Sequence, residues 1–158
     1  MDRMVKGLRI IEDQLDGAEI AALLQLHLDE MHRNSPACSV HALPIEGLRA
    51  DDVTFWSAWD GAELAGCGAL RELAPDHGEI KSMRAAPAYR SREVGRAVLD
   101  HLIGEARARG YARLSLETGR SGAFEPAQRL YAANGFTVSV PFGSYQPDPF
   151  SLFMTRLL

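Results

Sequence analysis

The stretch from residue 78 to residue 110 constrains the fold of this chain more than any other part of the sequence. It opens with an alternating apolar and polar run over residues 80–83, which predicts a strand. A basic turn, Arg90-Ser91-Arg92, follows. A helical pattern then begins near Val94, and apolar residues continue it at positions 98, 99, 102, 103 and 106. Gly110 stands where a helix C-terminal cap is expected, so the stretch predicts a strand, a basic turn and a long amphipathic helix.

The junction between this strand and this helix has the properties of a phosphate-binding site. The first N–H groups of a helix have no partners within the helix, and the helix dipole adds about half a positive charge there. Arg90, Arg92 and Arg96 bring full positive charges to the same point. A charge-assisted hydrogen bond from such a group to a phosphate oxygen contributes about 1.5–3 kcal/mol. A solvated turn whose arginines only face water explains the same composition equally well.

The remaining elements follow from patterning along the chain. Residues 7–12 predict a first strand, and Asp16 with Glu19 predicts a capping box at the start of a helix that ends near residues 34–36. Two strands joined by an Asp60-Gly61 turn are expected next. Further strands are expected at 113–118, 136–140 and 151–157, and a further helix at 125–133. A length of 158 residues fits a single domain over residues 1–158.

Charge and composition exclude several classes of protein. The net charge is −4, and no basic run resembles a nucleic-acid-binding patch. No apolar stretch approaches the ~20 residues of a membrane-spanning helix, and the start of the sequence lacks a signal-peptide core. Cys38 and Cys67 form no CxxC pair, so neither a zinc site nor a disulfide framework is expected. We therefore expect a cytoplasmic protein with no metal, no membrane contact and no nucleic-acid partner.

The string Arg90-x-x-Glu93-x-Gly95-x-Ala97 resembles the R/Q-x-x-G-x-G/A pyrophosphate loop of the GNAT superfamily of acyl-CoA-dependent N-acyltransferases. The preceding strand, the Pro-x-Tyr-Arg sequence at 87–90 and the Leu-Tyr-x-x-x-Gly-Phe string at 130–136 stand in the family's order, over about residues 53 to 158. LETG at 116–119 and the segment 141–154 resemble a bacterial branch of small N-acetyltransferases. The resemblance implies a mixed α/β sheet of six to seven strands, with helices on both faces and a splay where the thioester of acetyl-CoA lies.

The resemblance also implies which residues hold acetyl-CoA. Strand backbone at Ser82, Met83 and Arg84 would pair with the pantetheine arm. The pyrophosphate would be held by the loop and the first helical turn, which contain Arg90, Ser91, Arg92, Glu93, Val94, Gly95, Arg96 and Ala97. Tyr131 matches the family tyrosine that lies near the CoA sulfur, which makes it the candidate acid for the leaving thiolate. A core aromatic on a helix face is its alternative interpretation.

Two carboxylates are candidates for the general base. Glu79 ranks first because it precedes Arg90 by the same offset as the strand glutamate that serves as base in the histone-modifying branch of the superfamily. An exposed strand residue is the alternative interpretation of Glu79. Glu117 is the second candidate, since it lies at the carboxyl end of the neighbouring strand, where sites form in open parallel sheets. His41 and His77 are more distant candidates.

The acceptor is the least determined part of the site. In relatives, the segment after the first helix lines the acceptor pocket, which makes Ser35, Ser39 and His41 candidates here; a capped short helix and loop is the alternative. An acidic small molecule would find cationic and hydroxyl partners at Arg71, Arg84, Arg120 and Tyr145. The resemblance implies acetyl transfer to a primary amine of a small or amino-acid-like acceptor, by direct attack in a ternary complex. Homodimers are common in this superfamily, and the apolar last strand is a candidate contact.

Glu93 departs from the family pattern, which has glycine at this place. Glycine permits a positive φ or a close backbone approach, and a carboxylate would repel a nearby pyrophosphate. We therefore expect weaker binding of CoA than in a relative with glycine. A non-catalytic acyl-CoA-binding or interaction module that kept the fold is the alternative function that this departure favours.

Overall fold

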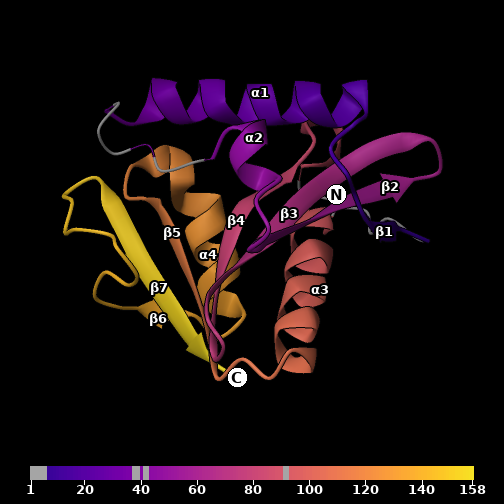
Figure 1. Cartoon of the computed structure of the whole chain (residues 1–158). Coiled ribbons are helices and arrows are strands. Elements are labelled where there is room, and N and C mark those ends of the chain that lie inside the picture. The colour runs from indigo at the N-terminus through magenta and orange to yellow at the C-terminus, as the bar shows by residue number, and fades with distance from the viewer. Residues whose placement is uncertain (1–6, 37–39, 41–42, 91–92) are drawn as a thin grey trace.

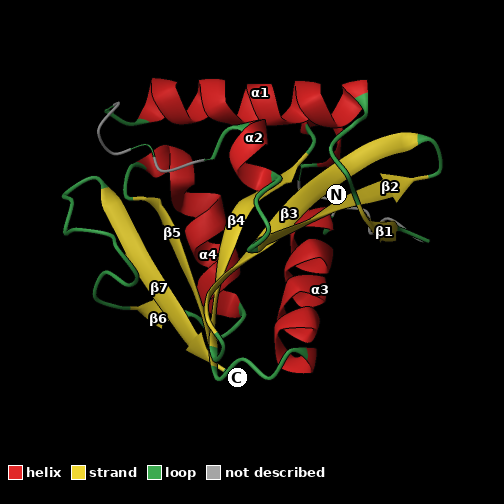
Figure 2. Cartoon of the chain, in the orientation of Figure 1, coloured by secondary structure: helices red, strands yellow, loops and turns green. Residues whose placement is uncertain are grey.

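The computed structural model describes residues 7–36, 40, 43–90 and 93–158. The described residues form one sheet of seven strands in the order β1-β2-β3-β4-β5-β7-β6 (Figures 1 and 2). The strands are β1 (Arg9–Glu12), β2 (Val53–Asp60), β3 (Glu63–Ala74), β4 (His77–Ala85), β5 (Arg113–Gly119), β6 (Thr137–Val138) and β7 (Ser151–Leu157). The helices are α1 (Ala18–Asn34), α2 (Ile45–Leu48), α3 (Val94–Ala108) and α4 (Glu125–Ala133), with short 3-10 turns at Pro87–Tyr89 and Gly122–Phe124. The expectation of a mixed sheet of six to seven strands is confirmed.

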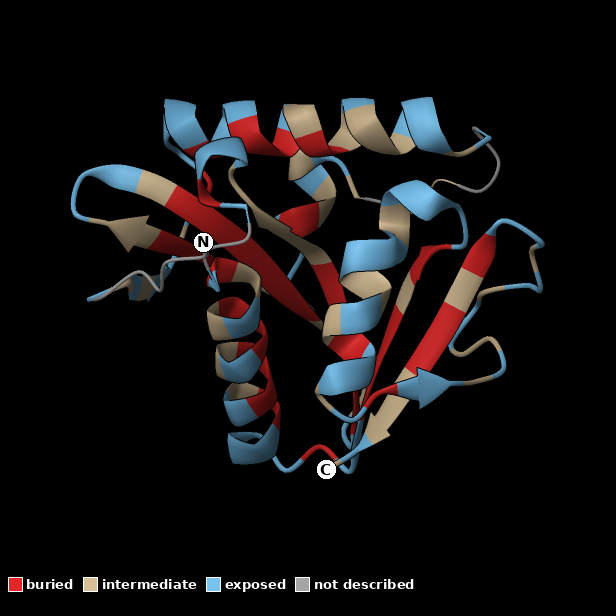
Figure 3. Ribbon diagram, turned by 180° about the vertical axis from the view of Figure 1, so that it is seen from behind, coloured by how far each residue is buried: buried red, intermediate tan, exposed pale blue. Residues whose placement is uncertain are grey.

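Helices cover both faces of the sheet, as the sequence predicted. Successive side chains of a strand point to opposite faces. On β2, Phe55 therefore joins the cluster formed with α1 and α2, whereas Trp56 joins the larger cluster formed with α3 and α4. Figure 3 shows the buried residues concentrated on the central strands and on the helix faces that meet them. The core thus consists of two layers separated by the sheet.

Two glycines on β3 allow α3 to lie close to the sheet. A Cβ atom at Gly66 would lie 2.7 Å from the carbonyl oxygen of Arg84 and 2.9 Å from a methyl group of Val94. A Cβ atom at Gly68 would lie 2.8 Å from a methyl group of Val98. Both valines belong to the buried face of α3 that the sequence pattern predicted. The small residues of β3 therefore determine how closely the start of α3 approaches this strand.

Replacing Gly66 by alanine is expected to destabilise the protein by about 1–3 kcal/mol, because the new Cβ atom would force the backbone carbonyl of Arg84 and the side chain of Val94 to shift. Gly104→Ala in α3 is the matched control, since a Cβ atom there meets nothing within 4 Å. Removing a helix-interior glycine should stabilise the protein by about 0.5–1 kcal/mol. Urea denaturation of the two variants measures both effects, and equal shifts of the same sign would contradict the packing argument.

β4 and β5 pair only at their beginnings and then separate. This is the parallel pair of the sheet, and it includes His77–Arg113, Gly78–Leu114 and Glu79–Ser115. Beyond these pairs the two strands diverge toward α1, and α4 is seen in the opening between them (Figure 1). A bulge on β4 accompanies the separation: Ser82 has a φ of +51°, and the register with β3 shifts there.

The Cys67 thiol supports this bulge rather than acting as a nucleophile. It lies 3.3 Å from the carbonyl oxygen of Ser82, to which it donates a hydrogen bond. Burial raises the pKa of Cys67 to about 12, so the thiol keeps its proton.

The start of α1 differs from the capping box expected at Asp16. Its N-cap is Gly17, in an extended conformation and without a side-chain hydrogen bond. The carboxylate of Asp13 instead holds the residues that precede the helix. It accepts hydrogen bonds from the backbone N–H of Leu15 at 2.7 Å and from the hydroxyl of Ser57 at 2.6 Å. The capping-box prediction was wrong because the carboxylate that serves this helix entry is earlier in the chain and is tied to β2.

The strand expected over residues 136–140 is also shorter in the structure. β6 covers only Thr137–Val138, and Val140 beyond it is 80% exposed, so no apolar contact extends the pairing. Among the described helices, none is both long enough and apolar enough to cross a bilayer.

Candidate active site

A cleft of about 780 Å³ lies where β4 and β5 separate. α1, the N-terminal turn of α3 and the side of α4 complete its walls. Most of the residues that the sequence assigned to acetyl-CoA or to catalysis line this cleft: Ser82, Met83, Arg84, Arg90, Glu93, Val94, Gly95, Arg96, Glu117 and Tyr131. Ala97 lies one position further into α3 and is not part of the lining, and Ser91 and Arg92 lie outside the described residues.

Glu93 occupies the N-cap of α3 in the left-handed conformation that glycine favours. Its φ is +67° and its ψ is 8°. The first intrahelical bond runs from the N–H of Ala97 to the carbonyl oxygen of Glu93, at 3.0 Å. The N–H groups of the preceding helical residues, Val94 to Arg96, are therefore available at the wall of the cleft. The glutamate thus adopts the backbone shape of the family glycine despite the strain of about 1–2 kcal/mol.

Replacing Glu93 by glycine is expected to strengthen acetyl-CoA binding severalfold and to stabilise the fold, because it removes both the left-handed strain and a carboxylate near an anion site. Glu93→Gln removes the charge and keeps the strain, so it separates the two causes. Calorimetric titration with acetyl-CoA and thermal unfolding measure the outcomes. Unchanged or weaker acetyl-CoA binding in the glycine variant would contradict the expectation.

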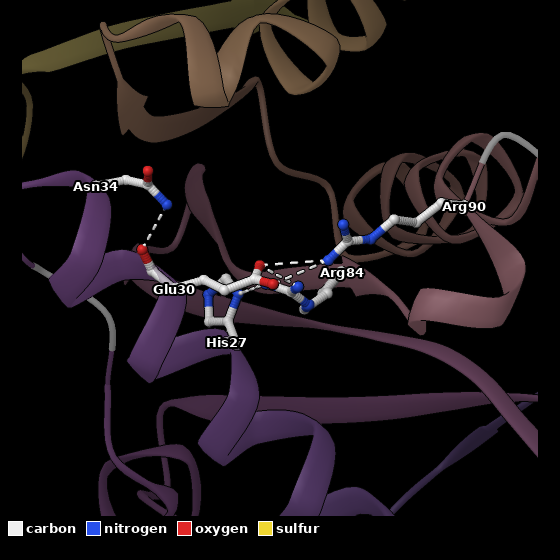
Figure 4. Close-up of polar contacts among 5 residues, drawn as sticks. All are labelled: His27, Glu30, Asn34, Arg84 and Arg90. Carbon is white, nitrogen blue, oxygen red and sulfur yellow. Dashed lines mark hydrogen bonds and ion pairs between the residues drawn. The ribbon is translucent and has the colours of Figure 1, made fainter.

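A charge cluster from three elements lies across the wall of the cleft (Figure 4). Glu30 of α1 forms ion pairs with Arg84, at the end of β4, and with Arg90, at 3.0 Å. Although burial alone would raise it, the hydrogen bonds from both arginines lower the pKa of Glu30. Burial and the Arg84 guanidinium lower the pKa of His27 to about 4, so His27 is neutral. These contacts join α1 to the strand and to the loop that precede α3.

Glu117 and Tyr131 face the same cleft from β5 and α4. Burial raises the pKa of Glu117 to about 7, and the charge of Glu79 adds to this rise. The Ser151 hydroxyl and, to a smaller extent, the Lys81 ammonium partly offset this rise. Burial, with a smaller effect of the Glu117 charge, raises the pKa of Tyr131 above its ordinary value. Tyr131 therefore keeps its proton, whereas Glu117 exchanges one near neutral pH.

Glu79 is buried at the end of the paired part of β4, with 1% of its surface exposed. Its Oε2 accepts a hydrogen bond from the hydroxyl of Tyr145 at 2.5 Å and lies 3.3 Å from the Nζ of Lys81. Lys81 also donates to the Tyr145 hydroxyl at 2.8 Å. The surface position that was the alternative interpretation of Glu79 is therefore wrong.

The other candidates for the acceptor site are dispersed. Arg71 lies on β3, lines neither this cleft nor the smaller cavity beside it, and pairs with Asp52 at 3.1 Å. The guanidinium of Arg120 donates to the backbone of Ser151. Tyr145 contacts Glu79, Ser35 lines the smaller cavity, and Ser39 and His41 lie outside the described residues.

Sequence reasoning missed three polar residues of this region: His27, Glu30 and Lys81. His27 is buried and lines the cleft. Glu30 follows His27 by three positions on the same face of α1. Lys81 follows Glu79 by two positions on the same face of β4. These spacings were the available signals.

The lining fits acetyl-CoA on structural grounds. The cleft joins free N–H groups at a helix N-terminus and two arginines, Arg90 and Arg96, to an apolar interior next to a proton donor and a proton acceptor. Gly95 faces α4, where a Cβ atom would lie 3.2 Å from Leu130. Among the described residues, no group of three histidine, cysteine or acidic side chains is arranged to hold a metal ion.

The comparisons with known proteins all point to the same family. Residues 20–136 match the model of the acetyltransferase (GNAT) family. The chain is 52% identical over 146 residues to the uncharacterized N-acetyltransferase YsnE of Bacillus subtilis, covering 92% of this chain and 97% of that protein. It is 44% identical over 146 residues to the uncharacterized N-acetyltransferase YedL of Escherichia coli, covering 92% of each chain. An IAA acetyltransferase of Azospirillum brasilense is 40% identical over 124 residues, or 78% of this chain and 80% of that protein.

Solved structures show the same fold. A protein of Klebsiella pneumoniae named as an acyl-CoA N-acyltransferase superposes with a TM-score of 0.77 at 30% identity, over 96% of this chain and 98% of that one. A GNAT family acetyltransferase of Elizabethkingia anophelis with acetyl-CoA bound superposes with a TM-score of 0.73 at 20% identity, over 97% and 99% of the two chains.

Proposed function

Because this chain belongs to the acetyltransferase (GNAT) family and is therefore an acyltransferase, we propose that it transfers the acetyl group of acetyl-CoA to a primary amine of a small or amino-acid-like acceptor. Acceptor and donor would be held together, and the amine would attack the thioester directly. The observation that carries this proposal is the pairing of Glu117 and Tyr131 at one cleft. One side chain can take a proton near neutral pH and the other can give one.

Residues of β4 and α3 would hold the donor. The backbone N–H groups at the start of α3, with Arg90 and Arg96, would bind the pyrophosphate. The bulge at Ser82 directs the end of β4 away from β5, so its backbone groups at Ser82 to Arg84 face the cleft rather than a neighbouring strand on that side. Bound there, acetyl-CoA supplies an electrophilic thioester carbonyl.

We assign the general base to Glu117. An acceptor amine is protonated at neutral pH and must lose a proton before its nitrogen can attack. A carboxylate with a pKa near 7 accepts that proton more effectively than one with an ordinary pKa. Glu79, the first candidate from the sequence, has its Oε2 occupied by Tyr145 and Lys81. Glu79 therefore stays an alternative prediction for this role.

Tyr131 is the proposed general acid. As the bond from the amine nitrogen to the acetyl carbon forms and the carbon–sulfur bond breaks, the Tyr131 hydroxyl gives its proton to the sulfur. Glu117 takes the proton of the ammonium, and a further proton leaves the amide nitrogen as the product forms. One of these two protons restores Tyr131, so an ammonium and a thioester become an amide, a thiol and one released proton.

Two measurements on the purified protein test the proposal. Calorimetric titration with acetyl-CoA should show binding at micromolar concentrations. Acetylation of a panel of primary amines should then release free thiol together with a product that is heavier by one acetyl group. Absence of binding up to millimolar concentrations would overturn the proposal, and binding with no turnover of any amine would favour the non-catalytic acyl-CoA-binding function.

A further inference from the structure

The carboxylate of Glu30 joins two parts of the cleft wall, α1 and the loop that precedes α3 (Figure 4). Its Oε1 and Oε2 lie 3.0 Å and 3.3 Å from Nη2 of Arg90, and Oε2 also pairs with Arg84. The side-chain amide of Asn34 donates to the carbonyl oxygen of Glu30 at 2.8 Å, in the last turn of α1. An arginine that we assign to the donor is thus already bound to a carboxylate of the same chain.

The two arginines that contact Glu30 differ in burial. The side chain of Arg84 is 11% exposed, whereas that of Arg90 is 55% exposed. Taking the carboxylate away from Arg84 would leave a nearly buried guanidinium without a counter-ion, which is costly. An exposed ion pair contributes little to stability and is readily exchanged. Arg90 is therefore the partner that Glu30 can release, and Arg84 is the one that it keeps.

The geometry of the Arg90 guanidinium brings a bound phosphate close to Glu30. A guanidinium binds a phosphate most strongly through two parallel N–H groups. Both edges that offer such a pair, Nε with Nη2 and Nη1 with Nη2, include Nη2. Because Nη2 of Arg90 lies within 3.3 Å of both Glu30 oxygens, a phosphate on either edge would lie beside a carboxylate. Two anions at that separation repel each other, so one of them has to leave Arg90.

Arg96, the second arginine assigned to the pyrophosphate, is held less firmly. Its guanidinium lies 3.8 Å from Glu93 and 3.9 Å from Asp100, beyond hydrogen-bond distance, and its side chain is 62% exposed. Both carboxylates belong to the N-cap and the first turns of α3 itself. Among the described residues, Glu30 is thus the carboxylate from another element that is hydrogen-bonded to an arginine of this site.

We propose that Glu30 is an internal competitor of the donor, which holds Arg90 when CoA is absent and is displaced from it by the pyrophosphate. This inference rests on the proposed function, because it takes Arg90 and the start of α3 as the pyrophosphate site. While CoA is bound, α1 and the loop are no longer joined through Arg90, and Glu30 stays with Arg84. When CoA leaves, Glu30 pairs with Arg90 again. Glu30 therefore lowers the affinity for CoA and favours its release after the reaction.

Glu30→Gln tests the competition in a calorimetric titration with CoA. The amide has nearly the same shape, and its oxygen can still accept a hydrogen bond from Arg84, but it carries no charge. The Kd for CoA should fall about fivefold, the upper range for a partly exposed ion pair. Asp52→Asn is the matched control, since Asp52 pairs with Arg71 at 3.1 Å outside the cleft lining, and its Kd should equal that of the wild type. An unchanged or higher Kd in Glu30→Gln overturns the proposal.

The same substitution in an Arg90→Gln background separates competition for Arg90 from general repulsion by the Glu30 charge. Without Arg90 there is nothing for Glu30 to occupy at the pyrophosphate site. Glu30→Gln should then change the Kd for CoA by less than about twofold, the limit within which independent sites are additive. A fivefold effect in both backgrounds would assign the gain to repulsion alone and overturn the competition.

Pantetheine, which lacks the phosphates of CoA, provides a probe that a structural change in α1 would also affect. If Glu30 acts through Arg90, Glu30→Gln should leave the Kd for pantetheine unchanged while it lowers the Kd for CoA. Equal gains for both ligands would show that the substitution reshapes the cleft, and the proposal would fail.

These titrations need no turnover, so they separate this inference from the proposed function. Coupling between Glu30 and Arg90 in a protein that acetylates no amine supports the competition and counts against the proposed catalysis. Acetylation of amines with the same Kd for CoA in Glu30→Gln and Asp52→Asn overturns the competition and leaves the proposed function standing. Absence of CoA binding up to millimolar concentrations in both the wild type and Glu30→Gln overturns both.

Discussion

Replacing Glu117 by glutamine is expected to lower the kcat for acetyl transfer by about 10²–10⁴-fold, the usual contribution of a positioned general base. Glutamine has nearly the same shape and cannot accept the proton. Acetyl-CoA affinity should remain close to that of the wild type, because the proposed pyrophosphate site lies at the start of α3. Steady-state kinetics together with calorimetric titration therefore distinguish a lost base from a lost donor site.

The pH dependence gives this prediction a second readout. The base must be ionised, so the kcat/KM of the wild type should rise with pH to a plateau, with a midpoint at the pKa of Glu117, about 7. The rise of kcat/KM near pH 7 should be absent from the residual activity of Glu117→Gln. It should remain in the control Glu12→Gln, which replaces an exposed strand glutamate of β1. A limb near pH 7 that survives in the glutamine variant would assign the titration to another group, with Glu79 the first candidate.

The free energy of unfolding should also depend on the protonation of Glu117. Burial raises the folded-state pKa of Glu117 to about 7 from its ordinary value of 4.5, so the folded state binds more protons than the unfolded state between these values. The stabilising effect of this group is full below pH 4.5 and is lost as the pH rises through 7. Glu117→Gln should therefore unfold at a higher temperature than the wild type at pH 8, although its activity is lower.

The sequence predicted the elements of the fold well because their signals are local. The helix from Glu125 to Ala133 and the last strand from Ser151 to Leu157 have the predicted bounds, and the turn at Asp60-Gly61 joins the predicted pair of strands. The splay of the sheet was expected only through family resemblance. The bulge at Ser82 that accompanies the splay depends on the pairing of β3 with β4 and has no signature within β4 itself.

The site was less predictable because its energetics depend on contacts between distant segments. Apart from Lys81, nothing local to Glu79 or Glu117 indicates that the first carboxylate is held by Tyr145 and that burial raises the pKa of the second. That distinction arises when the loop containing Tyr145 folds over β4, 66 positions from Glu79. The ion pairs of Glu30 with Arg84 and Arg90 likewise join residues 54 and 60 positions apart.

Glu93 stands where the family pattern has glycine, and this departure coincides with an unusual backbone conformation in the structure. A glutamate at a glycine position was expected to be unable to take a positive φ cheaply. It nevertheless has a φ of +67° at the N-cap of α3. The surrounding helix and loop impose this conformation, and its strain is the reason to expect a stabilising effect of glycine.

Replacing Tyr131 by phenylalanine is expected to lower kcat by about 10²-fold or more, because the leaving thiolate loses its proton donor. The substitution removes a single oxygen atom, and no described residue makes a hydrogen bond to that hydroxyl. The ring should keep its edge-to-face contact with Phe136, whose centroid is 6.0 Å away. Folding and acetyl-CoA affinity should therefore be nearly unchanged.

Tyr111→Phe is the matched control for this prediction. Tyr111 is also buried, but it lies outside the cleft lining, and its hydroxyl donates to Glu72 at 2.9 Å. Losing that hydrogen bond should cost about 1 kcal/mol of stability without affecting kcat. The two variants should thus behave in opposite ways, one losing turnover and the other losing stability.

The wild-type pH profile bears on Tyr131 as well. Burial and the Glu117 charge raise the pKa of Tyr131 above its ordinary value, so its proton is retained well above the pH at which Glu117 becomes ionised. Activity should therefore stay on its plateau from above pH 7 up to at least pH 9. If Tyr131→Phe kept the full kcat, the hydroxyl would have no chemical role, and Tyr131 would be a packing residue of α4 against Phe136. A kcat loss with unchanged acetyl-CoA affinity assigns it to proton transfer, since packing defects alone would weaken binding and folding together.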